Sequence, residues 1–200
     1  RLNKYLHDNE YLKTKNNESP VLRGHAYKVK FQNSNPNAQI IESGKFGEHY
    51  NYFFGQDESK WAGNVPLFKE VIYKDIYPGI ALSVHSSGEN LEYDFMVNAG
   101  AGVSNIVLNF EGTDGLQIEN GNLKIKTSVA DIIEQQPFAF QLIDGKKKTI
   151  RCEYRLNGHD VTFHFPDGYD TQYELVIDPV IVAATYSGTT YRAYAHTATY

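Results

Sequence analysis

The sequence predicts an all-β fold in which antiparallel sheets pack in a sandwich-like arrangement. Aromatic residues make up 14% of the 200 residues, led by 15 Tyr and 11 Phe, and large aromatic side chains are enriched in strands. Apolar and polar residues alternate in many short segments, which is the period of a half-buried strand. Glycine-containing turn dipeptides separate several of these segments. No stretch has the period and caps of a long helix.

The chain divides into a polar beginning and a long β region. Residues 1–20 lack a sustained apolar period and are predicted to form a loosely held lead-in. The all-β domain is predicted to span residues 21–179. Its first strand is indicated by Tyr27, Val29 and Phe31, which alternate with lysines.

Further strands and their turns follow in regular succession. Alternation recurs in segments 80–84, 91–97, 106–110, 123–126, 138–142, 150–156, 161–165 and 173–177. Tight turns are predicted at Asp114-Gly115, Asn120-Gly121, Asp144-Gly145, Asn157-Gly158 and Asp167-Gly168. These turns predict an antiparallel meander. The best helical candidate is short and runs from Asp57, as the N-cap, to Trp61.

Two places break the strand pattern. Residues 98–105 contain two glycines between alanines, which is typical either of a boundary between two subdomains or of a loop inside one domain. Asp178-Pro179 ends the last strand of the predicted domain. Residues 180–200 then begin a new β pattern, which predicts the start of a separate unit.

Composition argues against several classes of partner. The formal net charge is −5, and no basic stripe is present, so nucleic acid is not expected as a partner. No window approaches eighteen consecutive apolar residues, so no transmembrane segment is predicted. The single cysteine, Cys152, alternates with Ile150 and Tyr154 and is interpreted as a buried apolar residue.

The sequence predicts no catalytic residue, metal site or cofactor. Glu92 and Asp94 share a strand face about 7 Å apart, near the carboxylate separation of some glycosidases, but they are interpreted as the solvent side of that strand. His159 and His164 lack a metal-binding spacing. No phosphate-binding loop or G-x-S-x-G nucleophile motif occurs. The chain is therefore predicted to be non-enzymatic.

A group of aromatic residues is the best candidate for a binding surface. Flat rings can stack on sugar faces or on a partner protein. The alternative interpretation is that the rings fill the core or cover the junction with the next domain. The candidate residues are Tyr50, Tyr52, Trp61, Tyr73 and Tyr77.

Several longer segments of the sequence occur in a recognisable order. They are LRGHAYKVKF at 22–31, YNYFFGQDESKW at 50–61, VIYKDIYPGI at 71–80, LEYDFMV at 91–97, LKIKTSVADIIEQQP at 123–137, FPDGYD at 165–170 and VIDPV at 176–180. The chain resembles the β-rich domain of unknown function that precedes SBBP-type β-propeller repeats in secreted, gliding-motility-associated proteins of Bacteroidetes. Residues 181–200 look like the opening of the first propeller blade.

This resemblance implies export by a type IX-like secretion route and a place outside the cell or on its surface. It assigns no catalytic residue to the domain. The expected role is a structural scaffold that caps or presents the downstream propeller, and the alternative is a carbohydrate-binding or adhesion module. The expected partners are the propeller repeats of the same chain, a surface glycan, or outer-membrane and secretion proteins.

Overall fold

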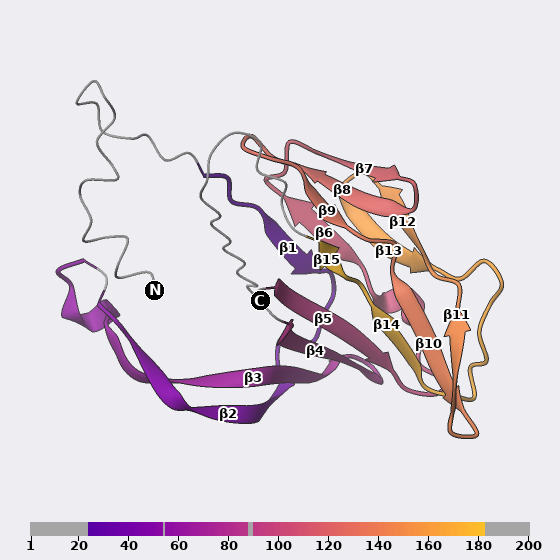
Figure 1. Ribbon diagram of the computed structural model, residues 1–200, viewed down its shortest axis with the longest axis horizontal. Coiled ribbons are helices and arrows are strands. Elements are labelled where there is room, and N and C mark those ends of the chain that lie inside the picture. The colour runs from indigo at the N-terminus through magenta and orange to yellow at the C-terminus, as the bar shows by residue number, and fades with distance from the viewer. Residues whose placement is uncertain (1–23, 54, 88–89, 183–200) are drawn as a thin grey trace.

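The computed structural model describes residues 24–182, apart from residues 54, 88 and 89. This part of the chain consists of antiparallel strands and two short 3-10 helices, with no α-helix among the described residues (Figure 1). The all-β prediction is confirmed. The predicted lead-in, residues 1–20, and most of the predicted repeat region, residues 183–200, lie outside the described residues.

The largest sheet has seven strands in the order β11-β10-β14-β5-β4-β3-β2. Every neighbouring pair is antiparallel. In chain order the strands are β2 (Gln39–Tyr52), β3 (Ala62–Tyr77), β4 (Ile80–Ser87), β5 (Asn90–Val97), β10 (Phe138–Ile143), β11 (Lys146–Ile150) and β14 (Leu175–Asp178).

Two smaller sheets have four strands each. One has the order β1-β6-β13-β12, and its strands are β1 (Lys28–Phe31), β6 (Leu108–Glu111), β13 (Asp160–His164) and β12 (Glu153–Asn157). The other has the order β15-β9-β8-β7, and its strands are β15 (Ile181–Val182), β9 (Ile132–Glu134), β8 (Asn122–Lys126) and β7 (Gly115–Glu119). The 3-10 helices are η1 (Glu58–Lys60) and η2 (Val103–Asn105).

One hydrophobic core joins the three sheets. Every second side chain of a strand points to the same face, and the inward-facing sets of all three sheets contribute to a single cluster. Phe95 of β5 is fully buried at its centre, with its ring centroid 6.1 Å from that of Phe31 on β1 and 5.8 Å from that of Phe163 on β13. The seven-stranded sheet therefore packs face to face on a four-stranded sheet, as in a sandwich.

Residues 98–105 form a loop inside this packed unit. The loop contains η2 and connects β5 with β6, but the core cluster includes residues from both sides of it. Strand β5 also pairs with β14, and β1 pairs with β6, so strands before and after the loop share sheets. Residues on both sides of the loop therefore share sheets and one hydrophobic cluster.

Three of the predicted turn dipeptides close hairpins. Asn120-Gly121 and Asp144-Gly145 have positive φ at both residues and join β7 to β8 and β10 to β11. Gly158, with φ +62°, lies in the turn between β12 and β13. Each is a position where glycine or asparagine tolerates the left-handed conformation.

The predicted simple meander is wrong in two places. Gly115 is the first residue of β7, and the left-handed residue in that stretch is Gly112, with φ +83°. Gly168 lies in the connection from β13 to β14, two strands that belong to different sheets. A dipeptide specifies the local backbone conformation, whereas the choice of pairing partner depends on the whole core.

Strands β2 and β3 form a curved two-stranded arm that leaves the body of the molecule (Figure 1). They contain 14 and 16 residues, and β2 is an edge strand that is exposed along its whole length. The pairing register shifts between Lys45 and His49 and between Tyr50 and Tyr52. Such bulges bend a ribbon and interrupt its free edge, which hinders unwanted pairing with other strands.

The chain remains attached to the body as it leaves the described region. Ile181 and Val182 of β15 pair with Glu134 and Ile133 of β9, and the backbone N–H of Gln135 donates to the carbonyl oxygen of Val180 at 2.8 Å. The first residues of the segment predicted to open a separate repeat are thus hydrogen-bonded to this domain. No helix in the described ranges has the length and apolarity needed to span a membrane.

Candidate functional site

The outer half of the arm carries three of the predicted aromatic residues. Tyr50 is 56% exposed, and Tyr52 and Trp61 are each 39% exposed. The ring centroids of Tyr50 and Tyr52 lie 6.2 Å apart, and those of Phe53 and Trp61 lie 5.3 Å apart with their planes at 83°. The rings therefore support one another while keeping substantial area open to solvent.

A short turn holds the end of the arm in shape. The carboxylate of Asp57 accepts hydrogen bonds from the backbone N–H of Ser59 at 3.2 Å and from its hydroxyl at 2.7 Å, which caps η1. The indole N–H of Trp61 donates to the carbonyl oxygen of Gly55 at 3.2 Å. The predicted helical turn with Asp57 as N-cap is confirmed. The hydrogen bond to Gly55 orients the indole ring.

The other two predicted aromatic residues lie at the base of the arm. Tyr73 is half-buried and packs against the core. Tyr77 is only 2% exposed and belongs to the core itself, where burial raises the pKa of its hydroxyl to about 12. Tyr77 therefore fills the core, as the alternative interpretation of these rings expected, and the five residues do not form one continuous surface.

The exposed apolar side chains of the described region concentrate on the arm. Of eleven large hydrophobic residues that are exposed, seven lie between residues 40 and 61. Sequence reasoning missed four of them because residues 39–52 lack the clean alternation that identifies a strand. The seven are Ile40, Ile41, Phe46, Tyr50, Tyr52, Phe53 and Trp61. Clustered exposed apolar residues are a common mark of an interaction surface.

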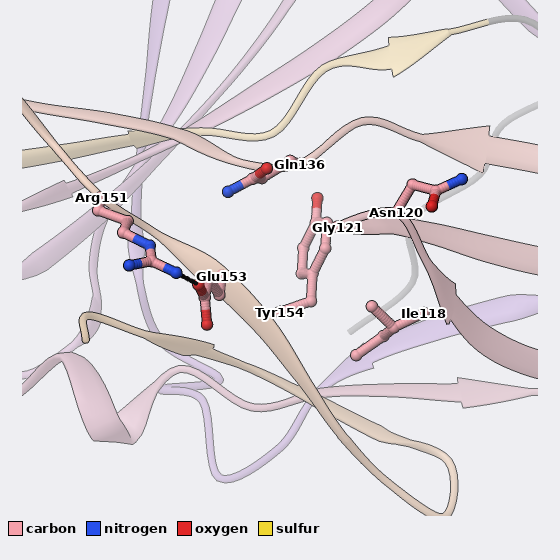
Figure 2. A pocket seen from close by; sticks show the side chains of 7 residues that line it. All are labelled: Ile118, Asn120, Gly121, Gln136, Arg151, Glu153 and Tyr154. Carbon is pink, nitrogen blue, oxygen red and sulfur yellow. Dashed lines mark hydrogen bonds and ion pairs between the residues drawn. The ribbon is translucent and has the colours of Figure 1, made fainter.

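A second candidate site is a pocket of about 520 Å³ between two of the sheets (Figure 2). One wall comes from β12 and the residues just before it, and the opposite wall from β7 and the turn that follows it. Figure 2 shows the ring of Tyr154 standing between the Arg151–Glu153 side and the Ile118 side. The lining residues are Ile118, Asn120, Gly121, Gln136, Arg151, Glu153 and Tyr154.

The walls of this pocket, called here the inter-sheet pocket, are fixed by specific contacts. The guanidinium of Arg151 lies 2.7 Å from a carboxylate oxygen of Glu153. The side-chain amide of Gln136 donates to the carbonyl oxygen of Cys152 at 3.1 Å. Gly121 has φ +82°, and a Cβ there would lie 2.7 Å from the amide oxygen of Gln136. A side chain at residue 121 would therefore force the end of the Gln136 side chain to shift.

A buried carboxyl group lies behind the pocket. Glu134 on β9 is 3% exposed and accepts a hydrogen bond from the hydroxyl of Tyr93 on β5. Burial raises the pKa of Glu134 to about 7, and the two neighbouring tyrosine hydroxyls, of Tyr93 and Tyr154, oppose part of that rise. Burial and the charge of Glu134 in turn raise the pKa of Tyr154. The bond between Tyr93 and Glu134 connects the seven-stranded sheet with the sheet that contains β9.

The carboxyl pair singled out in the sequence belongs to a charged group on the seven-stranded sheet. His85 on β4 lies 3.5 Å from a carboxylate oxygen of Glu92 and 3.8 Å from one of Asp94. Burial, followed by the charge of Asp178, raises the pKa of Asp94 to about 6. Both acids come from one strand, so they do not flank a substrate from two sides as glycosidase carboxyl groups do.

The single cysteine has a structural position. Cys152 is 1% exposed, which confirms the prediction of burial, and this burial raises the pKa of its thiol to about 12. A thiol with a raised pKa is a poor nucleophile at neutral pH. Within the described ranges, no group of three or more His, Cys, Asp or Glu residues is arranged to hold a metal ion.

Comparison with known proteins identifies a family but no characterised relative. The family model described as "Domain of unknown function (DUF7948)" matches residues 3–180. No curated protein and no solved structure matches the chain. Because the family model covers most of the sequence, this chain belongs to the DUF7948 family of domains of unknown function.

Proposed function

We propose that this domain is a non-catalytic scaffold of a secreted or cell-surface bacterial protein, where it caps and presents a β-propeller that follows it in the chain. The sequence resemblance supplies the expected neighbour, the type IX-like export route and the link to gliding motility. The pairing of β15, the last described strand, with β9 supports a structural role. The scaffold would hold the next domain in a defined position rather than on a free tether.

The observation that carries this proposal is the attachment of β15. Only Pro179 and Val180 separate β14 from β15, and both strands are built into sheets of the same body. Strand β15 pairs with β9 at Glu134, whose carboxyl group is bonded to Tyr93 of the seven-stranded sheet. Backbone pairing next to a buried hydrogen bond therefore holds the chain against the body through Val182.

The side chains that could have indicated catalysis have structural roles instead. The thiol of Cys152 is buried, and burial raises its pKa. Glu92 and Asp94 are paired with His85 on a sheet face. These contacts support a scaffold more than an enzyme, because catalytic groups are normally aimed into a cleft with open space for a substrate.

Limited proteolysis of the protein together with its following domain tests the scaffold role. A four-residue Gly-Ser insertion between Asp178 and Pro179 should separate β15 from its partner and accelerate cleavage at the junction at least tenfold. The matched control is the same insertion in the Asp144-Gly145 turn, which should leave junction cleavage unchanged. Equal cleavage in the unmodified protein and both insertion variants would contradict a rigid junction.

A carbohydrate-binding or adhesion module is the second candidate function. The observation that favours it is the exposed group of rings on the outer arm, Tyr50, Tyr52 and Trp61, because aromatic faces pack well on the C–H faces of sugars. A glycan array tests it, using the unmodified chain and a Tyr50→Ala, Tyr52→Ala, Trp61→Ala variant. Saturable binding that the folded variant loses would support adhesion through the arm, and absence of binding would reject it.

A further inference from the structure

The inter-sheet pocket has the size of a small-molecule site. Its volume of about 520 Å³ lies within the range of roughly 300–1,000 Å³ that is common for ligand pockets. Its walls come from two different sheets, with β12 at the edge of one and β7 at the edge of the other. The pocket therefore lies on elements of the body, separate from the arm.

The polar groups of the pocket are both donors and acceptors, and their charges cancel. Arg151 presents a fork of N–H donors, and Glu153 presents carboxylate acceptors, with the two groups held together at 2.7 Å. An anionic ligand at this pair would meet the carboxylate, and a cationic ligand would meet the guanidinium. Two adjacent hydroxyl groups of a neutral ligand can instead bond to both, because each hydroxyl donates and accepts.

An oriented amide lies on another wall of the pocket. The Nε2 group of Gln136 is held by the carbonyl oxygen of Cys152 at 3.1 Å, so its amide oxygen is turned away from that bond and lies close to Gly121. This oxygen is an acceptor with a fixed direction. A side-chain amide of this kind is well suited to receive a hydrogen bond from a hydroxyl group.

Ile118 supplies the apolar part of the lining, and Asn120 adds a further polar side chain. The ring of Tyr154 is only 5% exposed and therefore offers little surface to a ligand, and its hydroxyl is a neighbour of Glu134. Ile118 is 40% exposed and lies on the opposite side. A pyranose ring has C–H groups that pack on apolar surface and equatorial hydroxyls around its rim, which matches a site with apolar and polar walls.

We propose that the inter-sheet pocket binds a neutral saccharide unit, with adjacent hydroxyls on Arg151 and Glu153, a further hydroxyl on Gln136, and the C–H face against Ile118. This site differs from the exposed rings of the arm and does not depend on the scaffold role. It assigns a ligand class to a part of the domain in which the sequence indicated no function.

Amide chemical shifts in NMR titrations of the whole chain test the proposal. The probes are glucose, galactose, mannose and N-acetylglucosamine as neutral sugars, glucosamine as a cation and glucuronic acid as an anion. At least one neutral sugar should give saturable shifts at Gly121, Gln136 and Glu153. The two charged derivatives should bind at least tenfold more weakly than that neutral sugar, because each meets a like charge in the pocket.

Substitutions assign the binding to the pocket. Arg151→Ala and Glu153→Gln should each raise the Kd of the neutral sugar at least tenfold. Arg155→Ala is the matched control and should leave the Kd unchanged. Arg155 lies on β12 with Glu153 and bonds to His164 outside the pocket lining. Arg151 and Glu153 are partly exposed, so their variants should stay folded, which the dispersion of the same spectra reports.

Three results would overturn the proposal. The first is that no neutral sugar gives saturable shifts with the folded chain. The second is that Arg151→Ala and Glu153→Gln bind as well as the unmodified chain. The third is that the shifts occur at Tyr50, Tyr52 and Trp61 and disappear in the variant lacking those rings, which would assign sugar binding to the arm instead.

Discussion

The body and the arm are both made of antiparallel strands, but they use apolar residues in opposite ways. In the body, alternate residues such as Leu82, Phe95 and Ile177 are fully buried between sheets. Strand β2 of the arm has no buried residue, and it presents the rings of Tyr50 and Tyr52 to solvent. A packed core stabilises a fold, whereas clustered exposed apolar side chains favour contact with another molecule.

The largest expected effect is the loss of a ring from the centre of the body. Phe95→Ala should lower the free energy of unfolding by about 3–5 kcal/mol, because it removes buried contacts and leaves a cavity. The matched change on the arm is Phe53→Ala, where the ring is 63% exposed, and it should cost less than about 0.5–1 kcal/mol. Urea unfolding of both variants measures the difference. Equal losses would show that the arm folds as part of the core.

The buried carboxyl group predicts a pH dependence of stability. The folded chain holds the pKa of Glu134 at about 7, above its ordinary 4.5, so the folded state binds this proton more tightly than the unfolded state. The stabilisation is complete below pH 4.5 and is lost as the pH rises to 7. Because each tenfold change in proton affinity is worth about 1.4 kcal/mol, the loss is on the order of 3 kcal/mol.

Glu134→Gln isolates this contribution, since glutamine keeps an acceptor for Tyr93 but does not titrate. Urea unfolding between pH 4 and pH 8 should show a decline in the unmodified chain that is smaller in the variant, in which the raised pKa of Asp94 still contributes. Asp94→Asn is the comparison variant. Burial also raises the pKa of Asp94, but Asp94 is not part of the hydrophobic core cluster. Parallel pH profiles of the unmodified chain and Glu134→Gln would contradict the prediction.

A smaller effect is expected at two glycine turns that differ in their surroundings. Gly121 and Gly145 have φ of +82° and +74°, so alanine at either should cost about 1–2 kcal/mol through backbone strain. A Cβ at residue 121 would also lie 2.7 Å from Gln136, whereas one at residue 145 would meet no atom within 4 Å. Thermal unfolding should therefore show a larger loss for Gly121→Ala than for Gly145→Ala, and equal losses would exclude a tight fit of Gln136 on the turn.

The smallest effect on stability is expected from the outer arm. Removing the rings of Tyr50, Tyr52 and Trp61 together should change the free energy of unfolding by less than about 1 kcal/mol, because all three are substantially exposed. Urea unfolding measures it. A loss of unfolding free energy comparable with that of Phe95→Ala would contradict the distinction between body and arm. It would mean that these rings unfold cooperatively with the core.

Local features of the fold could be predicted from the sequence. Alternation identified the core strands β5 and β13, the capping pattern identified the turn at Asp57, and the Asn-Gly and Asp-Gly hairpins at 120–121 and 144–145 have the expected left-handed residues. The burial of Cys152 followed from its position in an alternating segment. Each of these depends on neighbours within a few residues along the chain.

Strand β10 shows where alternation alone misleads. Its apolar set includes Phe138 and Leu142, which are 37% and 58% exposed, while Ala139 and Gln141 face the core and are fully buried. The amide of Gln141 exchanges hydrogen bonds with the backbone of Asp170 at 2.7 and 3.0 Å. A buried glutamine is stable only because that distant loop supplies its partners, and no local pattern can indicate such a pairing.

The candidate sites depend on tertiary structure to an even greater degree. The sequence by itself determined the fold class, the positions of most core strands and the presence of aromatic residues around 50–61, since these follow from composition and period. Tertiary structure alone decided that Tyr77 is buried while Tyr50 is exposed, that Tyr93 reaches Glu134, and that Gln136, Arg151 and Glu153 share a pocket. The physical reason is that burial and side-chain contact depend on which sheets pack together, and that packing joins residues far apart in the chain.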